Sequence, residues 1–285
     1  MNIVIREATP ADAPACGKIC YDAFYKIGAD HNFPPDLPSP EAGIGLLGMM
    51  FAHPGFYSIV AELDGRLVGS NNLDERSSIP GIGPITVDPA VQNSKIGRDL
   101  MRAVMDRAES RNAPGIRLVQ AAYHNRSLSL YTKLGFDPRE PLSVMQGPAL
   151  GIKIDGYAVR KATESDLEAC NRVCRAVHGH DRSGELKDAI GMGSAVVVER
   201  HGKITGYSSA MAYFGHSVGE TNLDLKAMIG SAASFDGPGI LVPMRNAELF
   251  RWCLGHGLRV VAPMTLMTMG LYNEPVGAYL PGILY

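Results

Sequence analysis

Two short segments, 92–98 and 124–136, hold the residue types best suited to binding an anion and moving a proton. The first reads Gln-Asn-Ser-Lys-Ile-Gly-Arg and joins a strand-like segment to a helical pattern. Helix-opening amides lack internal partners and carry positive partial charge, so this turn predicts a phosphate site. Gly97 leaves the backbone open, and Lys95 and Arg98 can add charged contacts. Such turns also use glycine and lysine merely as caps and for solubility, so the loop alone leaves both interpretations open.

The second segment predicts a short helix that carries one tyrosine. Asn125 is expected to cap its first turn, and Gly135 is expected to end it in the left-handed conformation. Tyr131 lies six residues after this cap. On its own, such a tyrosine can close a core at a helix end with its amphipathic ring.

Together the two segments resemble the GNAT N-acetyltransferase superfamily. The motifs are V-D-P-x-x-Q-x-x-x-x-G over 87–97 and N-x-x-x-x-x-Y-x-K-x-G-F over 125–136, and the resemblance covers about 3–145. It implies an α/β (α+β) fold, with a mixed, mostly antiparallel sheet flanked by helices. It also implies acetyl-coenzyme A as cofactor and a small-molecule or peptide amine as acceptor.

The resemblance also implies roles for individual residues. The strand before the loop would lie along the pantetheine arm, the loop amides would hold the pyrophosphate, and Tyr131 would protonate the leaving sulfur. The residues expected to bind the cofactor are Ile85, Thr86, Val87, Gln92, Asn93, Ser94, Lys95, Ile96, Gly97, Arg98, Asn125 and Ser127. The chain departs from the family at Lys95, which replaces a glycine and puts a side chain where backbone normally approaches phosphate.

An amine acceptor requires a general base, because an alkyl ammonium with a pKa near ~10 must lose a proton before it attacks. Asp74 and Glu75, just past a strand, are the first candidates. Glu62, Asp88 and His124 are further candidates. No spacing singles out any of the five, and a solvated surface role is favoured for each of them.

The chain also repeats itself. Segment 5–20 matches segment 159–174 at seven of sixteen positions, and 58–72 resembles 195–209. The first pair reads as a strand and a helix capped by threonine. The second reads as a hairpin, with Gly65 in its turn. The first copy is longer between helix and hairpin, where the four prolines of 31–40 predict a loop.

We therefore predict two tandem GNAT-like domains: residues 1–147, which carry the catalytic site, and residues 148–285, a degenerate copy. No Q-x-x-G-x-G loop precedes the helical pattern near 247–255, where Pro243 and Met244 would obstruct a backbone cradle. The predicted function is N-acetyl transfer by direct attack, with Tyr131 as general acid. The alternative is a catalytically silent module that binds acyl-coenzyme A or a small ligand.

Composition excludes several other classes of function. A net charge of −2 over 285 residues leaves no basic excess for nucleic acid. The sequence shows neither an apolar run of membrane-spanning length nor a signal peptide, so we expect a cytoplasmic protein with no membrane partner. The five cysteines and the His178-Gly179-His180-Asp181 run lack metal-site spacing, so no metal is expected. The oligomeric state stays open, with a homodimer as one option.

Overall fold

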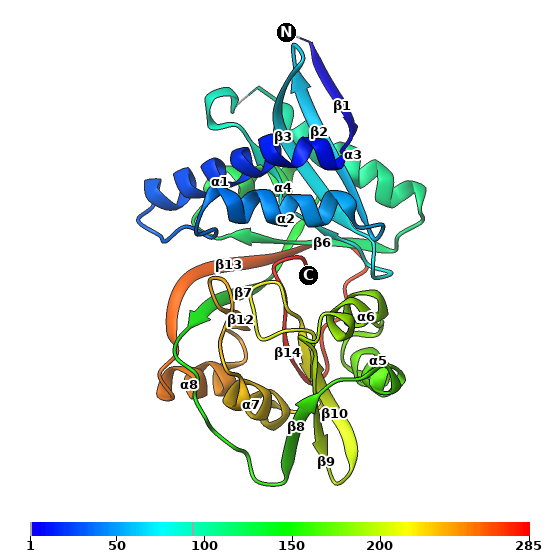
Figure 1. Cartoon of the computed structure of the whole chain (residues 1–285), viewed down its shortest axis with the longest axis vertical. Coiled ribbons are helices and arrows are strands. Elements are labelled where there is room, and N and C mark those ends of the chain that lie inside the picture. The colour runs from blue at the N-terminus through cyan, green and yellow to red at the C-terminus, as the bar shows by residue number, and fades with distance from the viewer. Residues whose placement is uncertain (1, 93) are drawn as a thin grey trace.

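The computed structural model describes residues 2–92 and 94–285, and it confirms the α/β class: helices pack on mixed, mostly antiparallel sheets (Figure 1). The elements of the first half are β1 (Ile3–Glu7), α1 (Ala13–Asp30), α2 (Pro40–Ala52), β2 (Phe56–Leu63), β3 (Arg66–Asp74), β4 (Gly81–Ile82), β5 (Thr86–Val87), α3 (Ile96–Ser110), β6 (Gly115–Ala121), α4 (Asn125–Lys133) and β7 (Asp137–Gln146).

The second half repeats this order with shorter connections. Its elements are β8 (Tyr157–Lys161), α5 (Leu167–His178), α6 (Ser183–Gly191), β9 (Val196–Arg200), β10 (Lys203–Ser208), β11 (Ser217–Gly219), α7 (Asn222–Ser231), β12 (Ile240–Pro243), α8 (Ala247–Gly255), β13 (Arg259–Gly270) and β14 (Ala278–Leu280). By order along the chain, α7 corresponds to α3 and α8 corresponds to α4. The prediction that the helix at 247–255 is the counterpart of the phosphate-binding helix was therefore wrong.

The predicted repeat is visible in the side-chain contacts. Arg6 makes a two-pronged ion pair with Asp12, with N–O distances of 2.9 Å, and Arg160 does the same with Asp166 at 2.7 and 2.8 Å. In each copy the aspartate also accepts the backbone N–H of the preceding threonine, at 2.8 Å. Each threonine opens a short 3-10 turn that leads into α1 or α5, rather than the α-helix itself.

Both predicted hairpins are also present. Gly65 joins β2 to β3 with φ of 81°, and Gly202 joins β9 to β10 with φ of 71°. Side chains other than glycine rarely adopt this left-handed region. The long connection of the first copy is a loop over 31–39, and Pro40 begins α2.

The strands of the two halves are interleaved in one sheet. Among the described residues, the larger sheet has nine strands in the order β1-β2-β3-β4-β6-β13-β7-β12, with β5 paired to β3. Thus β13, from the second half, lies between β6 and β7, and β7 lies between two second-half strands. Figure 1 shows β13 crossing the middle of the molecule. The remaining five strands form a sheet in the order β14-β11-β10-β9-β8.

Helices of the first half cover both faces of its strands. Ile59 and Ala61 on β2 pack into the cluster that includes α3, whereas Val60 packs with α1 and α2, as the alternation of a strand requires. The apolar residues of α3 that recur every four positions, Ile96, Leu100, Val104 and Ala108, are buried. Within the described residues, the structure contains no helix long and apolar enough to cross a membrane.

Candidate active site

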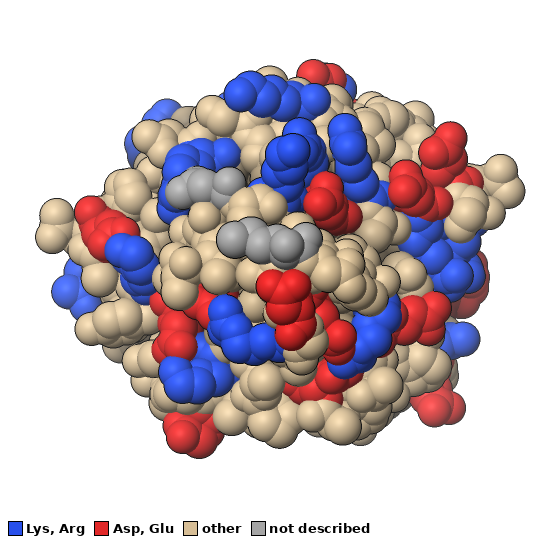
Figure 2. Space-filling view, turned by 90° about the horizontal axis from the view of Figure 1, so that it is seen from above, with Lys and Arg blue, Asp and Glu red and all other residues tan. Residues whose placement is uncertain are grey.

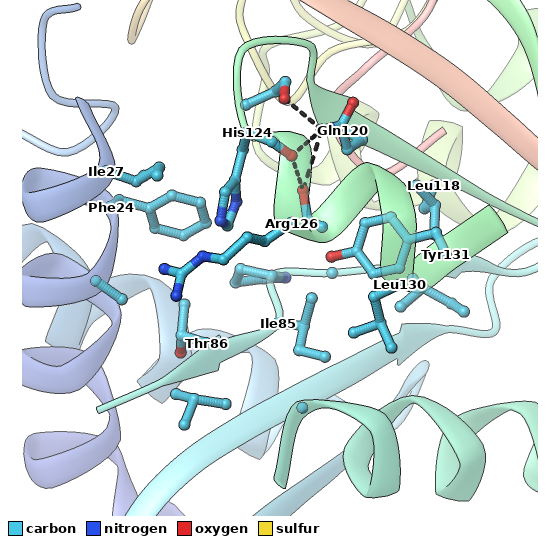
Figure 3. A pocket seen from close by; sticks show the side chains of 18 of the residues that line it. Phe24, Ile27, Ile85, Thr86, Leu118, Gln120, His124, Arg126, Leu130 and Tyr131 are labelled. Carbon is cyan, nitrogen blue, oxygen red and sulfur yellow. Dashed lines mark hydrogen bonds between the residues drawn. The ribbon is translucent and has the colours of Figure 1, made fainter. Parts of the chain in front are cut away.

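A pocket of about 970 Å³ opens where the first-half sheet divides. β5 pairs only with β3, and β4 meets β6 at a single pair, Gly81 with Arg117. β5 and β6 therefore diverge, and α4 follows β6 beside the opening (Figure 3). The pocket contains nearly every predicted cofactor residue: Ile85, Thr86, Val87, Gln92, Ser94, Lys95, Ile96, Gly97, Arg98, Asn125 and Ser127. Asn93 lies outside the described residues.

The loop before α3 holds its backbone open toward this pocket. Gln92 anchors it by donating from Nε2 to the Val87 carbonyl at 3.2 Å. Lys95 takes φ of 68° and ψ of −10°, which is the conformation that a glycine would favour, and its side chain is exposed. A methyl group added at Gly97 would be 3.8 Å from a Val87 methyl, so this position has room for it among the described residues.

Several basic side chains line the pocket. Its lining includes Lys26, Arg98, Arg102, Arg126 and Lys133. The Arg98 Nε atom is buried and finds no hydrogen-bond partner among the described residues, while Arg126 donates to Gln92 Oε1 at 2.9 Å. In Figure 2, which looks down on the first-half end, basic side chains gather along the upper edge of the view. This group of cations complements a ligand with several phosphates.

Tyr131 lies at the other side of the pocket. Its hydroxyl points into the space between α4 and the strand segment that holds Ile85 and Thr86 (Figure 3), and its ring packs edge-on to Phe136 at 6.4 Å. Burial raises the pKa of Tyr131, so the phenol keeps its proton at neutral pH. The ring is therefore part of the core and the hydroxyl faces the pocket, and the role of Tyr131 as general acid stays a prediction.

One prediction about α4 needs correction. The residue at its N-cap is His124, and Asn125 is the first helical residue. Gln120 donates to Ser127 Oγ at 3.0 Å and to the His124 carbonyl at 2.9 Å, which fixes the turn without a capping side chain from Asn125. Asn125 lines the pocket from the first turn of α4.

Four of the five predicted bases lie outside the pocket lining, each in an ion pair. Asp74 pairs with Arg76 at 2.6 Å, and Glu75 pairs with Arg107 at 3.0 Å. Glu62 and Asp88 are likewise bound to arginines. The spacing of Asp74 and Glu75 after a strand gave no information about which way they face, and both turn toward neighbouring cations.

His124 is the fifth predicted base, and it does line the pocket. Its Nε2 atom is buried without a partner among the described residues. Burial, reinforced by Arg126, lowers the pKa of His124 to about 4. The imidazole is therefore neutral at physiological pH and binds a proton only weakly.

Asp36 is a pocket carboxylate that sequence reasoning missed. It lies in the loop between α1 and α2, it is half-buried, and Tyr213 of the second half donates to its Oδ2 at 3.5 Å. Burial raises the pKa of Asp36 to about 6, although the hydrogen bond from Tyr213 opposes the rise. The signal available in the sequence was the proline-rich loop at 31–40, whose one carboxylate is this residue.

The sequence of this part of the chain matches a known protein family. Residues 22–136 match the model of the acetyltransferase (GNAT) family. This part of the chain therefore resembles a GNAT domain. No curated protein matches the chain at the level of sequence.

Solved structures extend the likeness of fold beyond the GNAT domain. A proposed acetyltransferase from Pyrococcus horikoshii is 20% identical with a TM-score of 0.74, covering 99% of this chain and 94% of that one. A GCN5-related N-acetyltransferase from Sphaerobacter thermophilus is 16% identical with a TM-score of 0.62, covering 95% and 96%. A tandem GNAT protein from the clavulanic acid biosynthesis pathway is 13% identical with a TM-score of 0.58, covering 94% and 98%.

These comparisons confirm the predicted tandem GNAT architecture. GNAT acetyltransferases use acetyl-coenzyme A, so the predicted cofactor and the transfer of an acetyl group agree with the family. The division at residues 147 and 148 and the degenerate state of the second copy stay predictions.

The helix that corresponds to α3 in the second half is capped by its own side chains. The carboxylate of Asp224, in the first turn of α7, accepts the Thr221 backbone N–H at 2.8 Å and is also bonded to the buried Thr205 hydroxyl. An internal carboxylate thus occupies the helix end where a phosphate would bind. This arrangement supports the prediction that the copy has lost its cofactor site.

Proposed function

We propose that this protein is an acetyl-coenzyme A-dependent N-acetyltransferase whose acceptor is a primary amine. The supporting observation is that one pocket joins the open helix end at Gly97, the hydroxyl of Tyr131 and the carboxylate of Asp36. The reaction requires these three groups: a binding site for the cofactor phosphates, a general acid and a general base.

The residues of the loop and α4 fit the cofactor. The amides at the start of α3 hold the diphosphate, and Arg98, whose Nε makes no hydrogen bond to any described residue, adds a charged contact. Ile85 and Thr86 on one side and Asn125 on the other line the channel for the pantetheine arm. Lys95 also lines the pocket, and its exposed ammonium adds a further positive charge beside the diphosphate.

Acid and base are supplied from opposite sides of the pocket. Bound acetyl-coenzyme A supplies a thioester whose C–S bond breaks as the amine nitrogen forms the new C–N bond. Asp36, ionised at neutral pH because its pKa is about 6, accepts a proton from the ammonium. Tyr131, whose pKa is raised by burial, donates the proton that the leaving sulfur takes up, and it regains one as the nitrogen loses its second.

Release of free thiol from acetyl-coenzyme A, measured with a panel of primary amines, tests this function. Tyr131→Phe should lower kcat by about 10²-fold or more, which is the usual contribution of a positioned acid. Tyr25→Phe, at an exposed tyrosine on α1 outside the pocket lining, is the matched control and should change nothing.

The result that would overturn the enzyme hypothesis is tight binding of acetyl-coenzyme A with no thiol release for any amine, unaffected by Tyr131→Phe. That outcome would instead support a catalytically silent module that binds acyl-coenzyme A.

A further inference from the structure

We propose that the acceptor is a primary amine carried on an apolar or aromatic group, and that Tyr213 and Phe214 of the second half form the surface that selects it. This inference rests on the proposed function and deepens it. It assigns the second copy a role in substrate choice, which neither the family match nor the sequence motifs provide.

Second-half residues form one wall of the pocket. Tyr213, Phe214, Met264, Ile283 and Leu284 all line it. They come from three separate segments, which meet the first half where β13 and the last residues of the chain pack against it (Figure 1). The wall is therefore part of the fold, although none of its residues lies within the GNAT motifs.

The segment that carries the two aromatic residues is held rigidly. The Ile283 backbone N–H donates to the Tyr213 carbonyl at 2.8 Å, and the Tyr213 N–H donates to the Asp236 carbonyl at 3.0 Å. A methyl group added at Gly282 would meet the Phe214 carbonyl oxygen at 2.9 Å, so the two backbones are packed closely. Tyr213 is buried, whereas the Phe214 side chain is 40% exposed.

Aromatic and aliphatic side chains of both halves pack around the segment that carries Asp36 and around Tyr213, which contacts Asp36. Phe33, three residues before it, stacks on Tyr123 with ring centroids 4.2 Å apart, and both rings pack in the cluster that contains Tyr213. Leu37 follows Asp36 directly and packs with Leu284. A primary amine whose ammonium group pairs with Asp36 therefore matches this pocket best when the rest of the molecule is apolar.

The charges of the lining favour a single cationic group on the acceptor. Asp36 and Asp30 are the only carboxylates that line the pocket in the described part of the chain. Asp30 is already paired with Lys26, at 2.8 Å. A polyamine would bring additional ammonium groups with no further unpaired carboxylate in the described lining to meet them, and the basic side chains of that lining would repel them. A sugar amine would bury its hydroxyl groups against apolar side chains, which is unfavourable.

The test compares 2-phenylethylamine with spermidine and glucosamine as acceptors at saturating acetyl-coenzyme A. We expect kcat/KM for 2-phenylethylamine to exceed that for each polar amine by about tenfold or more. Phe214→Ala should raise KM for 2-phenylethylamine about tenfold while leaving KM for acetyl-coenzyme A unchanged. Leu254→Ala, at a similarly exposed apolar residue on α8, is the control and should leave both constants unchanged.

Failure of the inference is distinct from failure of the proposed function. Equal or better turnover of spermidine or glucosamine, or an unchanged KM in Phe214→Ala, would overturn the inference and leave N-acetyl transfer standing. Absence of turnover with every amine would overturn the proposed function. In that case calorimetric titration of the same amines decides the inference: tighter binding of 2-phenylethylamine, weakened by Phe214→Ala, supports it, and any other result overturns it.

Discussion

The hydroxyl of Tyr213 lies 3.5 Å from Oδ2 of Asp36, and these two residues come from different halves of the chain. Asp36 belongs to the loop between α1 and α2, while Tyr213 lies between β10 and β11. The donor partly offsets the effect of burial on the carboxyl pKa. A residue of the second copy therefore adjusts the protonation of the base proposed for the first.

The pH dependence of kcat/KM should report this contact. Activity should fall below about pH 6, where Asp36 becomes protonated. Tyr213→Phe removes a hydrogen bond that lowers the Asp36 pKa, so the acidic limb should move to higher pH. Asp36→Asn should abolish the limb and lower kcat by about 10²–10⁴-fold. Tyr25→Phe is the control and should leave the pH profile unchanged. If the acidic limb of the profile does not move in Tyr213→Phe, then Tyr213 does not influence the pKa of Asp36.

The sequence could predict features that depend on neighbouring residues, and it could not predict partners from the other half. The turn glycines Gly65 and Gly202 and the apolar stripe of α3 follow from local conformation and periodicity. The position of β13 beside β6 does not, because alternation along a strand says which residues are buried and nothing about which strand lies alongside. Asp36 was missed for the same reason, since its environment is made by Tyr213.

Cofactor binding at the start of α3 can be separated from folding with Gly97→Ala. The methyl group of alanine at this position meets no side chain closely, and alanine favours a helix more than glycine does. The free energy of unfolding should therefore stay equal or rise by up to about 1 kcal/mol. Affinity for coenzyme A, measured by calorimetry, should fall about tenfold or more because the new methyl stands where the backbone meets phosphate. Gly45→Ala in α2, another helical glycine with open space, should leave affinity unchanged. Unaltered affinity in Gly97→Ala would place the diphosphate elsewhere.

Lys95 should be replaceable by glycine with a gain in stability. Its φ of 68° disfavours a side-chain-bearing residue by roughly 1 kcal/mol, part of which the greater freedom of glycine in the unfolded chain offsets. We expect Lys95→Gly to raise the free energy of unfolding by about 0.5 kcal/mol and to bind coenzyme A at least as well. Lys95→Ala keeps the strain and removes the charge, so a gain in that variant as well would show that backbone conformation is not the cause.

Tyr285 should couple the stability of the two halves. Its buried ring lies 4.7 Å from the guanidinium of Arg117 on β6 and 5.1 Å from that of Arg182, and its hydroxyl is 2.9 Å from His178 Nδ1. Tyr285→Ala should lower the free energy of unfolding by about 3–5 kcal/mol, and Tyr285→Phe by about 1 kcal/mol. Chemical denaturation followed by fluorescence measures both. Equal losses in the two variants would mean that the ring contributes little.

The interleaved strands predict that residues 1–147 do not fold alone. β13 pairs with β6 from Met264–Ala121 to Gly270–Gly115, and on its other side it pairs with β7. Without β13 the backbone edges of both strands lose their partners, and the core between them loses Leu266 and Met267, which are fully buried.

Expression of 1–147 should therefore give aggregated protein or protein without a cooperative unfolding transition, whereas co-expression with 148–285 should restore a soluble complex. Circular dichroism during thermal unfolding distinguishes the outcomes. A cooperative transition in isolated 1–147 would show that the first copy closes its own sheet, and that β13 completes a sheet which is already stable. In the interleaved arrangement the cofactor pocket exists only when both halves are present, because β6, which leads into α4 and Tyr131, is held in place by a strand of the second copy.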